Sequence, residues 1–179
     1  MIQKFCLIII NLIFGGMVLY SYYIGLNKEP ELSLKLWGGV PAILQPIITG
    51  SMFISAIGYF CFTYNFLVNV DVENILFLNT FNYWFLNIVY LLILIPSMLW
   101  INLTFKYMKS GNPFDWYIVV AILFCIAIAS IILFLFIVDT KYENNTFIYL
   151  VSVIGGSFFV FHTLFLDGFI WTVFFNKQP

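Results

Sequence analysis

Five apolar runs of membrane-spanning length are the feature that most constrains how this chain can fold. They cover residues 5–26, 46–68, 83–108, 116–138 and 147–175. A bilayer core of roughly 30 Å needs about 20 apolar residues for each helical crossing. Backbone groups at that depth must find their hydrogen bonds inside the protein, which favours helices. The sequence therefore predicts an all-α polytopic integral membrane protein, a bundle of five transmembrane helices.

The composition agrees with this prediction and leaves no room for a separate soluble domain. Only 8% of the residues are charged and 63% are hydrophobic, whereas soluble domains carry about 25% charged residues. Five crossings take up most of the 179 residues. We therefore expect residues 1–179 to form a single membrane domain embedded in the lipid bilayer, with 27–45 as an interfacial loop between the first two spans.

The charges and cysteines argue against several classes of function. The net charge is -1 and the seven lysines are scattered, so no basic stripe is available to bind nucleic acid. Cys6, Cys61 and Cys125 lie in different apolar runs without the spacing of a metal site. The sequence contains no Gly-rich phosphate loop and no catalytic triad order, and it points to no cofactor. It therefore gives no argument for an enzyme.

The lysines predict the orientation of the chain in the membrane. With five spans, one side of the membrane holds the first loop, the third loop and the C-terminal tail, which carry Lys28, Lys35, Lys106, Lys109 and Lys177. The opposite side holds Lys4 and Lys141. Cytoplasmic loops are enriched in lysine and arginine, so we expect the C-terminus in the cytoplasm and the N-terminus outside.

Small residues predict which helix faces come together. Helix association in lipid depends on close backbone approach and on hydrogen bonds between helices. The second span has a small-residue ridge from Gly50 to Gly58, and the fifth has one from Ser152 to Ser157. In the fourth span only Ala121, Cys125 and Ala129 recur on one face. We therefore expect that helix to turn a narrow stripe inward and a broad face to lipid.

Pro96 lies in the middle of the third span and predicts a kink there. A proline removes one backbone donor, which leaves the carbonyl near Leu92 available to a neighbouring helix or to Ser97. Such a kink can shape a cavity, although it also occurs as a packing feature without any ligand.

His162 and Asp167 are the polar residues at membrane depth that the architecture does not explain. They are the only histidine and the only carboxylate well inside a span. Ionisable groups at this depth mark substrate pathways or proton relays. On an α-helix a spacing of five residues separates them by about 140°, so we expect no direct hydrogen bond unless the helix breaks at Gly168. In the competing interpretation each residue bonds to a neighbouring helix and fixes the packing.

Further candidates for binding are Trp37 in the first loop and Tyr59, Tyr64 and Asn87 inside the second and third spans. The loop 27–45 combines a short amphipathic piece with a Gly38-Gly39 hinge and flanking prolines. Such a segment can lie in the headgroup plane or fold over the bundle as a lid. These residues predict an aromatic intramembrane pocket below the loop.

The second span carries Ser55-Ala56-Ile57-Gly58-Tyr59, which is similar to the S-A-M-G-Y stretch of the tryptophan-rich translocator (peripheral-benzodiazepine-receptor-like) family. The chain also resembles that family in its five helices, its abundant aromatic residues and its long first loop. The family's N-x-x-W pattern in the third helix is not matched. The resemblance implies a bundle cavity that binds a sterol or a tetrapyrrole, lined by Tyr59 and by aromatic residues of the first, second and fifth helices.

Three functions follow from the sequence. The first is a membrane protein whose aromatic pocket binds a small hydrophobic ligand or a lipid. The second is an accessory or structural subunit of a larger membrane complex or homo-oligomer, since no chemical motif is present. The third is a proton-coupled transporter or channel that uses His162 and Asp167, because histidine changes its charge near neutral pH.

Overall fold

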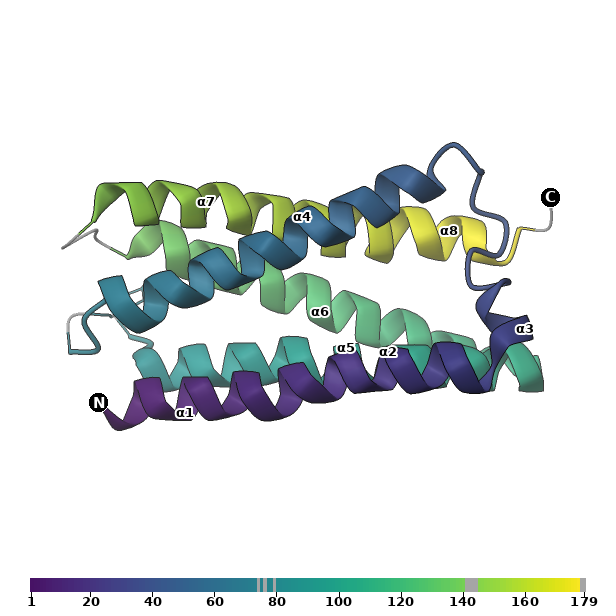
Figure 1. Cartoon of the computed structure of the whole chain (residues 1–179), viewed down its shortest axis with the longest axis horizontal. Helices are drawn as coiled ribbons and strands as arrows, with labels where there is room; N and C mark the ends of the chain where they lie inside the picture. The colour runs from purple at the N-terminus through teal and green to yellow at the C-terminus, as the bar shows by residue number, and fades with distance from the viewer. Residues whose placement is uncertain (74, 76, 79, 141–144, 178–179) are drawn as a thin grey trace.

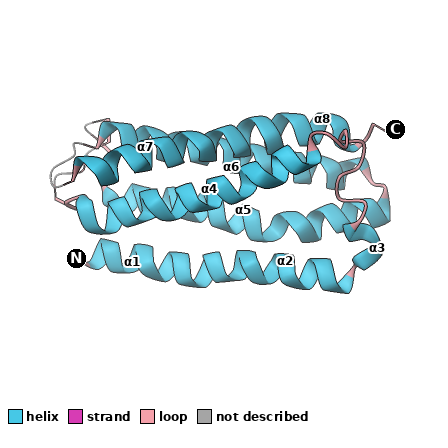
Figure 2. Ribbon diagram, turned by 45° about the horizontal axis from the view of Figure 1, so that its top comes forward, coloured by secondary structure: helices cyan, strands magenta, loops and turns pink. Residues whose placement is uncertain are grey.

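The computed structural model describes residues 1–73, 75, 77–78, 80–140 and 145–177. In these residues five helices are long and apolar enough to cross a membrane: Ile2–Lys28, Gln45–Asn69, Tyr83–Ser110, Pro113–Asp139 and Thr146–Phe175. They run lengthwise beside one another and are joined at the two ends of the bundle (Figure 1, Figure 2). This confirms the predicted all-α five-helix membrane architecture. The helices extend beyond the predicted runs by at most three residues at either end.

Three of the five helices contain a π-helical stretch, named here η. The first is built from α1 (Ile2–Ile10), η1 (Asn11–Gly15) and α2 (Gly16–Lys28), and the short α3 (Pro30–Ser33) follows it. The second joins α4 (Gln45–Tyr64) to η2 (Asn65–Asn69). The third and fourth are α5 (Tyr83–Ser110) and α6 (Pro113–Asp139). The fifth joins α7 (Thr146–Val160), η3 (Phe161–Trp171) and α8 (Thr172–Phe175).

Asparagine side chains fix where the last three helices begin. Asn82, Asn112 and Asn145 precede α5, α6 and α7, and each accepts a hydrogen bond from a backbone N–H of the first turn. This is the capping interaction that asparagine favours at helix starts. Gly111 ends α5 with a φ of 62°, a left-handed conformation that glycine adopts readily.

The centre of the bundle is formed by α5 and α6, with α4 packed against α7 and the first helix against α5. The expectation that the fourth span turns a broad face to lipid is wrong. Helix α6 contacts α5, α7 and η3, and it buries large side chains that include Leu123, Leu133 and Phe136. The first helix is peripheral, since Leu7 and Gly25 are its only buried residues.

The two termini lie at opposite ends of the bundle (Figure 1). Lys28, Lys35, Lys106, Lys109 and Lys177 are all at the end that carries the C-terminus, and Lys4 is at the other end. The predicted grouping of these lysines is therefore confirmed. Lys141, which also entered the prediction, lies outside the described residues.

Helix α5 continues through Pro96, and a neighbouring helix reaches the carbonyl that the proline leaves without its usual donor. The Cys125 thiol of α6 lies 3.8 Å from the Leu92 carbonyl oxygen. Ser97 instead donates to the carbonyl of Ile93, at 2.6 Å. The proline thus supplies an acceptor for a contact between α5 and α6.

The loop between α3 and α4 is fastened to the end of the fifth helix. Gly39 N donates to the Phe175 carbonyl oxygen at 3.2 Å, and Trp171 Nε1 donates to the Leu36 carbonyl oxygen at 2.9 Å. A Cβ on Gly38 would lie 2.2 Å from the Phe175 carbonyl oxygen, and Gly38 has a φ of 49°. The glycine pair, which the sequence suggested as a hinge, therefore serves close packing.

Candidate functional site

His162 and Asp167 contact each other inside the fifth helix. The distance from His162 Nε2 to Asp167 Oδ2 is 3.3 Å. The expectation that they point about 140° apart is wrong because residues 161–171 form a π-helix. In that helix the backbone hydrogen bonds connect residues five positions apart, which brings such pairs onto one face.

The pair lies well within the membrane span. Asp167 precedes the end of α8 at Phe175 by eight residues, about 12 Å along a helix axis. The side chain of His162 is 9% exposed and that of Asp167 is 33% exposed. His162 Nδ1 is buried and has no hydrogen-bond partner among the described residues. A buried polar atom of this kind has unused capacity for a ligand or a water molecule.

A hydroxyl pair positions the π-helical stretch on its neighbour. Ser130 Oγ of α6 and Thr163 Oγ1, adjacent to His162 in the chain, lie 2.7 Å apart and are buried. Thr163 Oγ1 also donates to the Phe159 carbonyl at 2.9 Å. On the other side of the pair, Thr172 donates to the Gly168 carbonyl. The Ser130–Thr163 contact therefore holds η3 against α6 beside His162, whereas the two hydrogen bonds to carbonyls lie within the fifth helix itself.

Three aromatic side chains, here called the aromatic wall, gather on the C-terminal side of the pair: Tyr22, Trp100 and Trp171. Tyr22 stacks on Trp100 with 5.7 Å between ring centroids, and Trp171 meets Trp100 edge-on at 5.3 Å. Tyr22 also interacts electrostatically with Asp167. Trp100 Nε1 is buried without a hydrogen-bond partner in the described part of the chain. The wall is therefore a closely packed aromatic cluster, in which Trp171 is 4% exposed, and it contains one unused donor.

The sequence candidates Tyr59 and Tyr64 do not line one common pocket. Tyr59 donates to Asn11 Oδ1 at 2.6 Å. Its ring packs against Phe62, Tyr90 and Phe159, with centroids 5.3 to 5.8 Å away. Tyr64 is 52% exposed on the outer surface of the bundle. Tyr59 thus belongs to the aromatic core, and Tyr64 faces away from it.

Asn87 and Trp37 lie near opposite ends of the molecule. Asn87 Nδ2 donates to the Gln3 carbonyl oxygen at 3.2 Å, close to the N-terminus. Trp37 is half-buried in the loop at the other end and packs against the core. Among the six sequence candidates, the contacts of the described residues bring together only His162 and Asp167.

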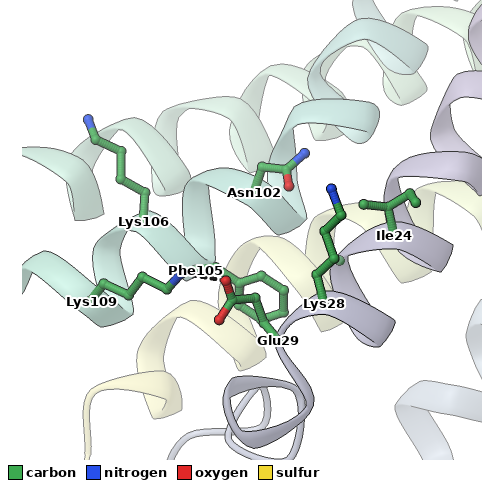
Figure 3. Close-up of a pocket in the computed structure, with 8 residues that line it drawn as sticks. Ile24, Lys28, Glu29, Asn102, Phe105, Lys106 and Lys109 are labelled. Atoms are coloured by element: carbon green, nitrogen blue, oxygen red, sulfur yellow. Dashed lines mark hydrogen bonds and ion pairs between the residues drawn. The ribbon is translucent and has the colours of Figure 1, made fainter.

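A pocket of about 330 Å³ lies between α2 and α5, away from all six of these residues (Figure 3). Its lining consists of Ile24, Gly25, Lys28, Glu29, Asn102, Phe105, Lys106 and Lys109. The lysines of this pocket served only to predict the orientation of the chain in the membrane. That α2 and α5 bring them together was not predicted from the sequence. No group of three or more possible metal ligands occurs among the residues that the structure describes.

The stretch Ser55–Tyr59, which carries the family resemblance, contributes Ser55 and Gly58 to the contact between α4 and α7. Ser55 Oγ donates to the Phe158 carbonyl at 3.1 Å, and Gly58 lies directly against Gly155. Comparisons with protein-family models, curated proteins and solved structures gave no match to the chain. Functional arguments therefore rest on the site itself.

Proposed function

We propose that this integral membrane protein binds a small, largely apolar molecule at the His162–Asp167 pair, and that binding is coupled to protonation of the pair. The observation that carries the proposal is the 3.3 Å contact of an imidazole and a carboxylate at membrane depth. Ionisable residues are costly there, and they recur at substrate and proton pathways. π-Helical turns are likewise frequent at functional sites.

The surroundings of the pair indicate the chemistry of the ligand. The aromatic wall gives the pair an apolar neighbour made of two indole rings and a phenol, a chemistry that suits a flat apolar body. The carboxylate of Asp167 can accept hydrogen bonds, and Trp100 Nε1, which has no partner among the described residues, can donate one. A sterol, with one hydroxyl, and a tetrapyrrole, with pyrrole N–H groups and carboxylates, both combine such a body with a few polar groups.

Coupling to protons follows from the residue types. An unperturbed histidine changes its charge between pH 5 and 8, and a histidine in contact with a carboxylate titrates together with it. Tyr22 from α2 is a further titratable group that interacts with Asp167. A ligand that binds one protonation state better shifts the pair toward that state. This is the elementary step of proton-coupled transport.

Ligand binding and its pH dependence can be measured on the full chain in mild detergent. We expect cholesterol or protoporphyrin IX to raise the Tm, with a shift that changes between pH 5 and 8, and native mass spectrometry should show the bound molecule. Asp167→Asn should abolish the pH dependence. Asp139→Asn is the matched control, since Asp139 is an exposed carboxylate at the end of α6.

Two outcomes would contradict the proposal. One is that neither cholesterol nor protoporphyrin IX changes the Tm at any pH. The other is an equal effect of Asp167→Asn and Asp139→Asn. Stable co-purification of other chains without a bound small molecule would instead favour the accessory-subunit hypothesis.

A further inference from the structure

The pocket between α2 and α5 lies where a lipid headgroup would meet the protein. Lys28 is the last residue of α2, and Lys109 is in the last turn of α5. Both helices therefore end at the pocket, at the lysine-rich end of the bundle. Four of its eight lining residues are exposed: Lys28, Asn102, Lys106 and Lys109. The pocket is thus an open hollow at the rim of the membrane span.

The lining carries an excess of positive charge, with three lysines and one glutamate. Two of the ammonium groups have carboxylate partners. Lys109 Nζ lies 2.5 Å from Glu29 Oε1, and Lys106 Nζ lies 2.7 Å from Asp115 Oδ1. Lys28 forms no ion pair within the described residues. Its ammonium and the amide of Asn102 extend toward each other across the pocket, whereas Lys106 points away (Figure 3).

The floor of the pocket is apolar and continues toward the membrane. Phe105 is buried, and Gly25 allows α2 to approach the Ile101 side chain of α5. Toward the middle of the membrane span, Tyr20 lies one turn from Ile24 on α2, and Leu99 lies one turn from Asn102 on α5. Their side chains are 64% and 40% exposed. Residues three or four positions apart share a helix face. An acyl chain leaving the pocket would therefore run over Tyr20 and Leu99.

We propose that this pocket binds the phosphate headgroup of an anionic phospholipid, with Lys28 and Asn102 as its main partners and the acyl chains lying over Tyr20 and Leu99. Basic pockets between transmembrane helices on the cytoplasmic side suit such headgroups. The volume of about 330 Å³ matches a small binding site. The charge of the lining favours an anionic over a zwitterionic lipid.

Lipid retention by the full chain in a neutral maltoside detergent tests the proposal. Equal amounts of dioleoylphosphatidylglycerol and dioleoylphosphatidylcholine are added, and native mass spectrometry counts the lipid that stays bound. We expect the protein to retain the phosphatidylglycerol preferentially. Lys28→Gln should weaken this binding about fivefold, the effect of one lysine near a charged membrane surface. Asn102→Ala should weaken it as well.

Lys35→Gln is the matched control, because Lys35 is exposed at the same end of the molecule but does not line the pocket. It removes the same charge and should leave retention unchanged. Equal retention of both lipids by the wild type, or equal effects of Lys28→Gln and Lys35→Gln, would overturn the proposal. If millimolar inorganic phosphate displaced the bound phosphatidylglycerol as effectively as added phosphatidylglycerol does, the pocket would be a site for soluble anions. This result would also overturn the proposal.

Discussion

The contact between α4 and α7 and the contact between α2 and α5 join helices in different ways. At the first, glycine meets glycine. A Cβ built on Gly58 would lie 2.6 Å from the Gly155 carbonyl oxygen. The close approach lets serine side chains reach across: Ser55 Oγ donates to the Phe158 carbonyl at 3.1 Å, and Ser152 Oγ lies 3.3 Å from that of Cys61. Here backbone meets backbone.

At the α2–α5 contact side chains separate the two backbones. Gly25 faces the Ile101 side chain, whose Cδ1 atom would lie 3.0 Å from an added Cβ. Tyr22 stacks on Trp100, and Lys109 pairs with Glu29 at the rim. Because lipid tails are as apolar as leucine, close approach and hydrogen bonds decide how firmly helices associate. We therefore expect α4 and α7 to associate more firmly than the first helix and α5. Substitutions at the α4–α7 contact should cost more stability than substitutions at the α2–α5 contact.

The largest effect is expected from Gly58→Ala. The new Cβ overlaps backbone atoms of Gly155, which cannot rotate away as a side chain can. Overpacking of this kind typically costs about 1–3 kcal/mol, and we expect the upper end. The free energy of unfolding, measured by titration from mild detergent into dodecyl sulfate, gives the value.

Gly50→Ala is the control for this substitution. Gly50 lies in the same helix, and an added Cβ meets no atom within 4 Å. Alanine has the better helix propensity by about 1 kcal/mol, so this variant should be as stable as the wild type or more so. Equal destabilisation by both substitutions would show that the glycine contact is not what holds α4 to α7.

A smaller effect is expected where the first helix meets α4. The Tyr59 hydroxyl donates to Asn11 Oδ1 at 2.6 Å, and hydrogen bonds between membrane helices average about 0.6 kcal/mol. A double-mutant cycle of Tyr59→Phe and Asn11→Ala should give a coupling energy of about that size. A cycle of Asn11→Ala with Tyr90→Phe should give none, because the Tyr90 hydroxyl contacts Thr63. Coupling in both cycles would indicate indirect effects of repacking.

Much of the fold could be predicted because its signals are local. Span length and the small residues at Gly58 and Gly155 act through neighbouring atoms. The burial of α6 could not be predicted. Its inward face consists of large apolar residues such as Leu133 and Phe136, and these look the same in the sequence as residues that face lipid.

The candidate site was predictable in its residues and not in its geometry. His162 and Asp167 stand out by residue type, but on an α-helix their spacing predicts that they point in different directions. No residue between them indicates that this stretch is π-helical. Tryptophans are common near the ends of membrane spans, so the sequence gives no reason to place Trp100 and Trp171 beside the pair. The lysines of the α2–α5 pocket come together only through tertiary structure.

The smallest effect is expected from Gly25→Ala, which tests the other half of the comparison directly. The atoms nearest the added Cβ belong to the Ile101 side chain, at 3.0 to 3.3 Å, and that side chain can shift by a few tenths of an ångström. The strain is opposed by the better helix propensity of alanine, about 1 kcal/mol, so the two contributions should nearly cancel and leave a net change close to zero on the same unfolding titration. A loss as large as that of Gly58→Ala would mean that α2 is held as rigidly as α4. The first helix would then belong to the rigid part of the bundle, and the contrast between the two contacts would disappear.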